Sequence, residues 1–60
     1  MFTFKEGAFI KEGDRAILNF GYMDYSIGCV VCKLLGNGMI EVFCDYGMKY
    51  LCFPEMLQRA

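Results

Sequence analysis

The sequence predicts a single all-β domain of about five short strands, with one helical turn near its C-terminus. Short segments rich in apolar and β-branched residues recur between glycine-containing turns, as in small all-β proteins. No segment repeats apolar residues with a helical period over the length of an ordinary helix. Because 60 residues suffice for one domain only, we expect residues 1–60 to form one unit.

The first strand is predicted at residues 15–20, "RAILNF". Ala16, Leu18 and Phe20 alternate with more polar neighbours and would share one face of a strand. The preceding "EGD" is a turn signal in which Gly13 is free to adopt a positive φ. The glycines before this strand each end a short extended piece of chain.

Three further strands form a predicted antiparallel meander. Gly28 marks a bulge or a close approach of the backbone. The dipeptide Asn-Gly in "GNG" favours a type I′ hairpin turn, and "DYGM" predicts a second turn with Gly47 at positive φ. The predicted strands cover residues 27–35, 39–45 and 49–53.

The last segment, residues 54–60, is predicted as a short helical turn. Pro54 cannot continue a strand ladder but suits the first position of a helix, and Met56 or Leu57 would fill the core. Five short strands with tight turns in so few residues favour a small SH3-like barrel, since a sandwich needs more chain.

Composition narrows the functional classes. The apolar fraction of 57% exceeds the roughly 45–50% of soluble domains, which predicts a homo-oligomer whose subunits cover each other's apolar surface. The net charge of −1 and the scattered basic residues make nucleic acid an unfavoured partner. No apolar run approaches the roughly 20 residues of a membrane helix, and no signal peptide is recognisable, so we expect a cytoplasmic protein.

Four cysteines raise the question of a metal site. Without histidine, a zinc ion would need all of Cys29, Cys32, Cys44 and Cys52 as ligands. Residues 29 and 32 would face opposite sides of a strand, because side chains alternate with a period of two. We therefore expect the thiols to be packing groups, with no metal and no cofactor.

The segments "GDRAILNF", "DYSIGCVVCKLL", "MIEVFCDYG" and "FPEMLQR" together resemble a Tudor domain, over about residues 13–59. The most specific match is "VFCDYG". The usual Trp-Tyr pair before the second strand is replaced by "DYS". The resemblance implies a five-stranded SH3-like barrel with an aromatic cage that holds a methylated arginine or lysine by cation–π attraction. The implied cage residues are Phe20, Tyr25, Phe43 and Tyr46, with Asp45 as the acidic partner.

A weaker resemblance links "EGDRA" and the late "FPEMLQR" to the type II dihydrofolate reductases, which are tetramers of small barrels. Their catalytic Val-Gln-Ile-Tyr motif is replaced here by "YLCF", so the resemblance implies architecture only. With no histidine and no recognisable pair of nucleophile and base, we expect no enzymatic activity.

These observations predict a self-associating binding module that docks a protein or peptide partner. A viral protein, encoded by a phage or mobile element to inhibit a host protein, would fit its small size. The alternative is an oligomeric protein that sequesters a small molecule or nucleotide between its subunits. The predicted partner-binding residues are Phe20, Tyr22, Tyr25, Phe43, Asp45 and Tyr46.

Overall fold

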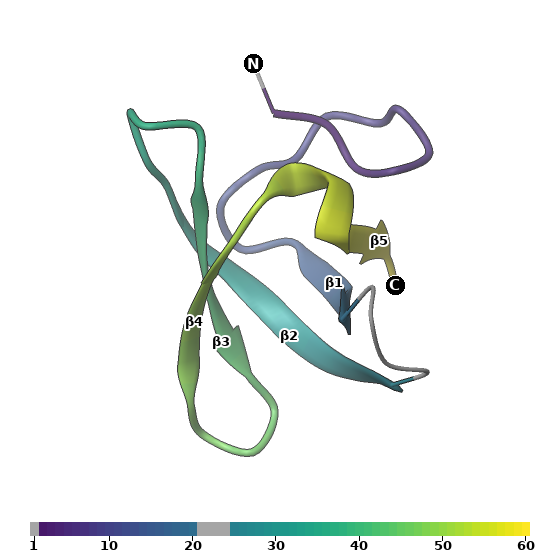
Figure 1. The fold of residues 1–60 in the computed structure, drawn as a ribbon, viewed down its shortest axis with the longest axis vertical. Coiled ribbons are helices and arrows are strands. Elements are labelled where there is room, and N and C mark those ends of the chain that lie inside the picture. The colour runs from purple at the N-terminus through teal and green to yellow at the C-terminus, as the bar shows by residue number, and fades with distance from the viewer. Residues whose placement is uncertain (1, 21–24) are drawn as a thin grey trace.

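The computed structural model describes residues 2–20 and 25–60, which form one antiparallel sheet of five strands (Figure 1). The strand order is β4-β3-β2-β1-β5, which confirms the predicted all-β class. Among the described residues, no helix has the length and apolar character required to cross a membrane. The elements are β1 (Arg15–Phe20), β2 (Tyr25–Leu34), β3 (Ile40–Cys44), β4 (Lys49–Cys52), the 3₁₀ turn η1 (Pro54–Met56) and β5 (Leu57–Arg59).

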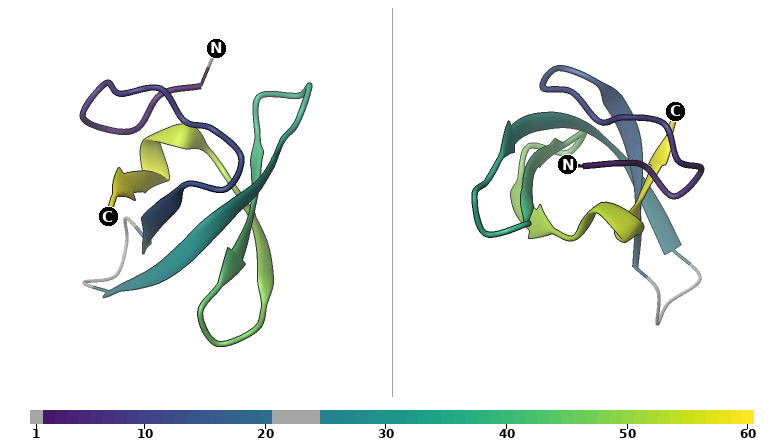
Figure 2. Two further views of the ribbon diagram at one scale, coloured as in Figure 1. Left: turned by 180° about the vertical axis from the view of Figure 1, so that it is seen from behind. Right: turned by 90° about the horizontal axis from the view of Figure 1, so that it is seen from above.

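The sheet curves around its buried face and stays open between its two edge strands. Within the described parts of the chain, β4 and β5 are not paired with each other. Figure 2 shows that η1 carries the chain from one edge to the other across this open side. The structure is therefore a curved open sheet, bridged by a short helical turn.

The core follows from alternation along each strand. In β3, Ile40, Val42 and Cys44 are buried, and in β1 Ala16 and Leu18 are buried against them and β2. Residues that alternate with these face outward, as expected for a pleated strand. The N-terminal segment contributes two more buried side chains, Phe4 and Ile10.

Both hairpins of the meander close through three-residue loops. The N–H of Cys44 donates to the carbonyl of Met48 at 2.7 Å, and Gly47 has a φ of 94°. The "GNG" loop has the same form, with Gly38 at a φ of 88°. A type I′ turn needs positive φ at Asn37 as well, and in the described chain only glycines have it. The type I′ prediction is therefore wrong, while Gly13 and Gly47 adopt positive φ as predicted.

The C-terminal segment differs from the prediction. The helical turn covers only Pro54–Met56, and the following residues form β5 instead of extending the turn. Leu57 lies opposite Leu18 in β1 and is fully buried. Pairing with β1 satisfies the backbone groups that a turn this short would leave without partners.

Two local features of β2 affect the surroundings of Asp45 and Cys32. Gly28 is a place of close approach, as predicted, because a Cβ there would collide with the side chain of Asp45 and lie 3.2 Å from its Cγ. The bulge lies further along the strand, where the register with β3 shifts between Val31 and Lys33. Cys32 is the extra residue of this bulge.

Candidate functional site

β1 ends, β2 begins and the β3–β4 turn lies at the same end of the sheet (Figure 1). Four aromatic residues from these elements and from β4 contact one another there. Phe20 is the last residue of β1, and Tyr25 is the first residue of β2 and its direct partner in the sheet register. Tyr46 lies in the turn after β3. Tyr50 lies in β4 opposite the buried Val42, so it is on the same face of the sheet as the core. We refer to these four rings as the aromatic cluster.

The rings are linked by direct contacts. Phe20 and Tyr25 stack with their centroids 5.8 Å apart and an interplanar angle of 20°. Phe20 also meets Tyr50 edge to face, at 6.0 Å and 77°. The hydroxyl groups of Tyr46 and Tyr50 are hydrogen-bonded at 3.0 Å. Stacked and edge-to-face arrangements are the two favoured geometries for aromatic pairs, so each ring supports the orientation of another.

The cluster consists of two rings that pack against the core and two rings that are accessible to solvent. Phe20 and Tyr50 are partly buried against the core. Tyr25 and Tyr46 remain 49% and 52% exposed. The hydrogen bond to Tyr50, together with partial desolvation and the charge of neighbouring groups, raises the pKa of Tyr46 to about 12. Tyr46 therefore carries a neutral hydroxyl at physiological pH and can both donate and accept hydrogen bonds.

The structure separates the residues that sequence reasoning grouped together. Phe20, Tyr25 and Tyr46 belong to the cluster, whereas Phe43 lies between the buried Val42 and Cys44 and projects from the opposite face of β3. Tyr22 lies outside the described residues. The sequence analysis missed Tyr50. In the predicted strand 49–53, Tyr50 is in phase with Cys52 and out of phase with the charged Lys49, and this alternation could have placed it on the core face.

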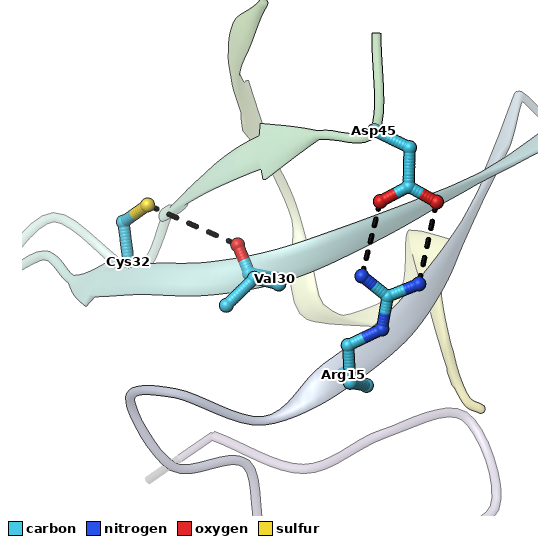
Figure 3. Close-up of polar contacts among 4 residues, drawn as sticks. All are labelled: Arg15, Val30, Cys32 and Asp45. Carbon is cyan, nitrogen blue, oxygen red and sulfur yellow. Dashed lines mark hydrogen bonds and ion pairs between the residues drawn. The ribbon is translucent and has the colours of Figure 1, made fainter. Parts of the chain in front are cut away.

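Asp45 is engaged elsewhere, in an ion pair with Arg15 (Figure 3). Two guanidinium nitrogens of Arg15 donate to its carboxylate oxygens at 3.0 and 3.2 Å. The hydrogen bond and the charge of Asp45 raise the pKa of Arg15 above its usual range. The pair lies over Gly28, so a side chain at this position would have to displace the carboxylate of Asp45. Asp45 therefore does not complete the aromatic cluster with an acidic group.

The cysteines behave as core residues. Cys29, Cys44 and Cys52 are buried, and Cys29 lies opposite Cys44 across β2 and β3. Burial raises the pKa of Cys29 to about 11 and that of Cys52 to about 12, which keeps both thiols protonated near neutral pH. Cys32 lies apart from them in the bulge, with its sulfur 3.9 Å from the carbonyl oxygen of Val30 (Figure 3). Within residues 2–20 and 25–60, no three potential ligands converge on a possible metal position.

No family model matches this chain, and neither the curated proteins nor the solved structures give a significant match.

Proposed function

We propose that this chain is a non-enzymatic binding module that docks a protein or peptide partner through the aromatic cluster. The observation that carries the proposal is the convergence of four aromatic rings from two pairs of strands. Two of these rings, Tyr25 and Tyr46, are about half exposed. Tyrosine is enriched at protein interfaces because its ring gives apolar contact area and its hydroxyl gives a hydrogen bond. Phe20 and Tyr50 hold the accessible rings in place, so little ordering would be needed on binding.

The cluster also fits the ligand class that the resemblance to Tudor domains implies. A cationic side chain over the face of an aromatic ring, within about 6 Å of its centroid, is attracted by the ring quadrupole. Three of the four implied cage residues, Phe20, Tyr25 and Tyr46, belong to the cluster, and Tyr50 supplies the fourth ring. These rings support recognition of a methylated lysine or arginine within a peptide.

The chemistry of the nucleophilic side chains supports a binding role. A thiol attacks as its thiolate, and the raised pKa values of Cys29 and Cys52 keep the thiolate fraction very small near pH 7. The sequence has no histidine to act as a base near neutral pH.

Self-association is part of the same proposal. Phe43 and Leu51 are exposed large apolar residues, and we refer to them as the outer apolar face. Phe43 and Leu51 alternate with buried residues of β3 and β4, so they project away from the core. Covering such a patch with a second subunit would remove apolar area from water. The aromatic cluster, on the core side of the sheet, would remain accessible.

The test compares two tyrosine variants, Tyr25→Ala and Tyr46→Ala, with Phe43→Ala as a matched control on the opposite face. Each immobilised protein is used to capture partners from a host-cell lysate, and isotope-labelled protein is titrated with matched trimethyllysine and unmodified lysine peptides. We expect the tyrosine variants to bind the captured partner at least about tenfold more weakly, and Phe43→Ala to bind it as the wild type does. Equal losses in all three variants, or no partner that depends on Tyr25 and Tyr46, would show that the cluster is not the docking site. Tighter binding of the trimethyllysine peptide would support recognition of a methylated cationic side chain. Equal binding of both peptides would exclude this ligand class.

A further inference from the structure

A second candidate site lies outside the aromatic cluster and shares no residue with it. The structure contains a cavity of about 330 Å³ between the N-terminal segment, the start of β1 and the end of β5. Its polar lining consists of Lys11, Asp14, Arg15 and Arg59, beside the ring of Phe9. Three of the six basic residues of the chain therefore meet at one place.

The charge of this cavity contrasts with the charge of the chain. Three cations against the single carboxylate of Asp14 give the charged side chains of the lining a formal charge of +2, since 3 − 1 = 2, and the ion pair of Arg15 with Asp45 reduces this to +1, since 2 − 1 = 1. The whole chain carries −1. A basic lining in an acidic protein is a local feature that attracts anions without making the whole surface basic.

The backbone fixes the positions of the lining residues. Ile10 is buried, so its neighbours Phe9 and Lys11 project to the outside on the same side of this extended segment. The carboxylate of Asp14 accepts the backbone N–H of Lys11 at 2.9 Å. This hydrogen bond holds the one acidic side chain of the lining in a local turn, and the lysine ammonium group forms no ion pair among the described residues.

The two arginines come from neighbouring strands. Arg59 lies opposite Ala16, the chain neighbour of Arg15, in the pairing of β5 with β1, and both arginines line the cavity. Arg15 uses two N–H donors for Asp45, and a guanidinium group has five. Among the described residues, neither Lys11 nor Arg59 forms an ion pair. The cavity therefore offers two cationic groups, those of Lys11 and Arg59, that have no ion-pair partner among the described residues.

Phe9 indicates that an anionic ligand of this cavity would also carry a planar ring. Its ring is 61% exposed beside the cavity, the largest exposed fraction among the large apolar residues described. A planar base or ring can stack on such a face, with a gain of the order of 1–3 kcal/mol for nucleic-acid bases on aromatic side chains. The volume is at the lower end of the roughly 300–1,000 Å³ of small-molecule sites.

We infer that this cavity binds a small phosphate-bearing molecule of mononucleotide size, with its phosphate on Lys11 and Arg59 and its ring on Phe9. Arginine and lysine are the usual phosphate ligands in proteins, and an arginine fork can hold two phosphate oxygens at once. Arg15, held in place by Asp45, provides the fixed edge of the site. The inference does not depend on the proposed function of the aromatic cluster.

The test is a titration of isotope-labelled protein with adenosine monophosphate, inorganic phosphate and adenosine, followed by amide chemical shifts. We expect the monophosphate to bind more tightly than either fragment and to shift residues around Phe9 and Lys11. Lys11→Gln and Arg59→Gln should each weaken the monophosphate about tenfold, because each removes one charge-assisted contact. Phe9→Ala should weaken the monophosphate but leave inorganic phosphate unchanged.

Lys49→Gln is the matched control, because it removes an exposed lysine from β4, which does not line the cavity. An equal loss of affinity in Lys49→Gln and Lys11→Gln would overturn the inference, since it would show attraction to net charge alone. Absence of monophosphate binding at about 10 mM, a concentration at which even millimolar affinity is visible, would overturn it as well. Binding of a single-stranded deoxyadenosine octamer far more tightly than the monophosphate would replace the small molecule with nucleic acid as the ligand.

Discussion

Alkaline pH should destabilise this protein through its buried thiols. The pKa of Cys29 is raised from 9.0 to about 11 and that of Cys52 to about 12, mainly by burial, which disfavours the thiolate. A group whose pKa is higher in the folded state stabilises that state fully below the unfolded pKa. The stabilisation is lost as the pH rises from about 9 toward 11 and 12, because the unfolded chain releases protons that the folded chain retains.

The size of the effect follows from the two pKa values. At pH 10 an unfolded thiol with a pKa of 9.0 is largely ionised, while the folded thiols of Cys29 and Cys52 remain mostly protonated. Each thiol should lower the free energy of unfolding by up to about 1.4 kcal/mol relative to neutral pH, and both together by up to about 3 kcal/mol. A domain of this size is expected to have a total stability of about 3–9 kcal/mol, so the loss is a large fraction of it.

Urea unfolding under reducing conditions, measured at pH values from about 7.5 to 10, tests this reasoning. Groups other than the thiols also titrate in this range, so the comparison is between wild type and Cys52→Ala. We expect the variant to be less stable than the wild type at pH 7.5, because it leaves a gap in the core, and this deficit should shrink by up to about 1.4 kcal/mol at pH 10. Ile40→Val removes core volume without a titrating group, and its deficit should stay constant. A deficit for Cys52→Ala that is also constant with pH would refute the assignment of a buried, protonated thiol.

Two further predictions concern Gly28 and the outer apolar face. In an Asp45→Ala background, Gly28→Ala should stabilise the fold by about 0.5–1 kcal/mol, because a glycine within a strand is replaced and no carboxylate obstructs the new methyl group. In the wild-type background the gain should be smaller, because the carboxylate of Asp45 must move away from Arg15 to make room. Thermal unfolding of the wild type, the two single variants and the double variant measures this difference. Equal gains in both backgrounds would contradict the close approach of Asp45 to Gly28. Leu51→Ser should lower the average mass in sedimentation experiments at micromolar concentration, while Asn19→Ser, an exposed change outside the outer apolar face, should not. A wild-type chain that is monomeric at all concentrations would exclude self-association.

The strands could be predicted because their signals are local. Alternation in residues 15–20 and glycines in the turns act within a few residues, and the structure has strands and turns at these places. β5 could not be predicted in this way, because its extended form depends on pairing with β1, about 40 residues earlier. Pro54 made the local preference look helical over the whole segment, and only three residues follow that preference.

The candidate site shows the same division. The motif "VFCDYG" placed Phe43, Asp45 and Tyr46 together because they are near one another in the sequence. Neighbouring residues of a strand face opposite sides, and the turn redirects Tyr46 toward Tyr50. The basic cavity had no sequence signal at all, since Lys11, Arg15 and Arg59 form no run and meet only where the N-terminal segment, β1 and β5 come together in the fold.

β1 connects the two proposed sites and keeps them apart. Arg15 at its start lines the basic cavity, and Phe20 at its end forms the base of the aromatic cluster. Five residue steps along a strand span about 17 Å, which is beyond the distance of roughly 7–10 Å over which substitutions usually interact. A partner on the aromatic cluster and a phosphate-bearing ligand in the cavity could therefore be bound at the same time. Losses from Tyr46→Ala and Lys11→Gln should then be independent, so that either site can be disproved without affecting the other.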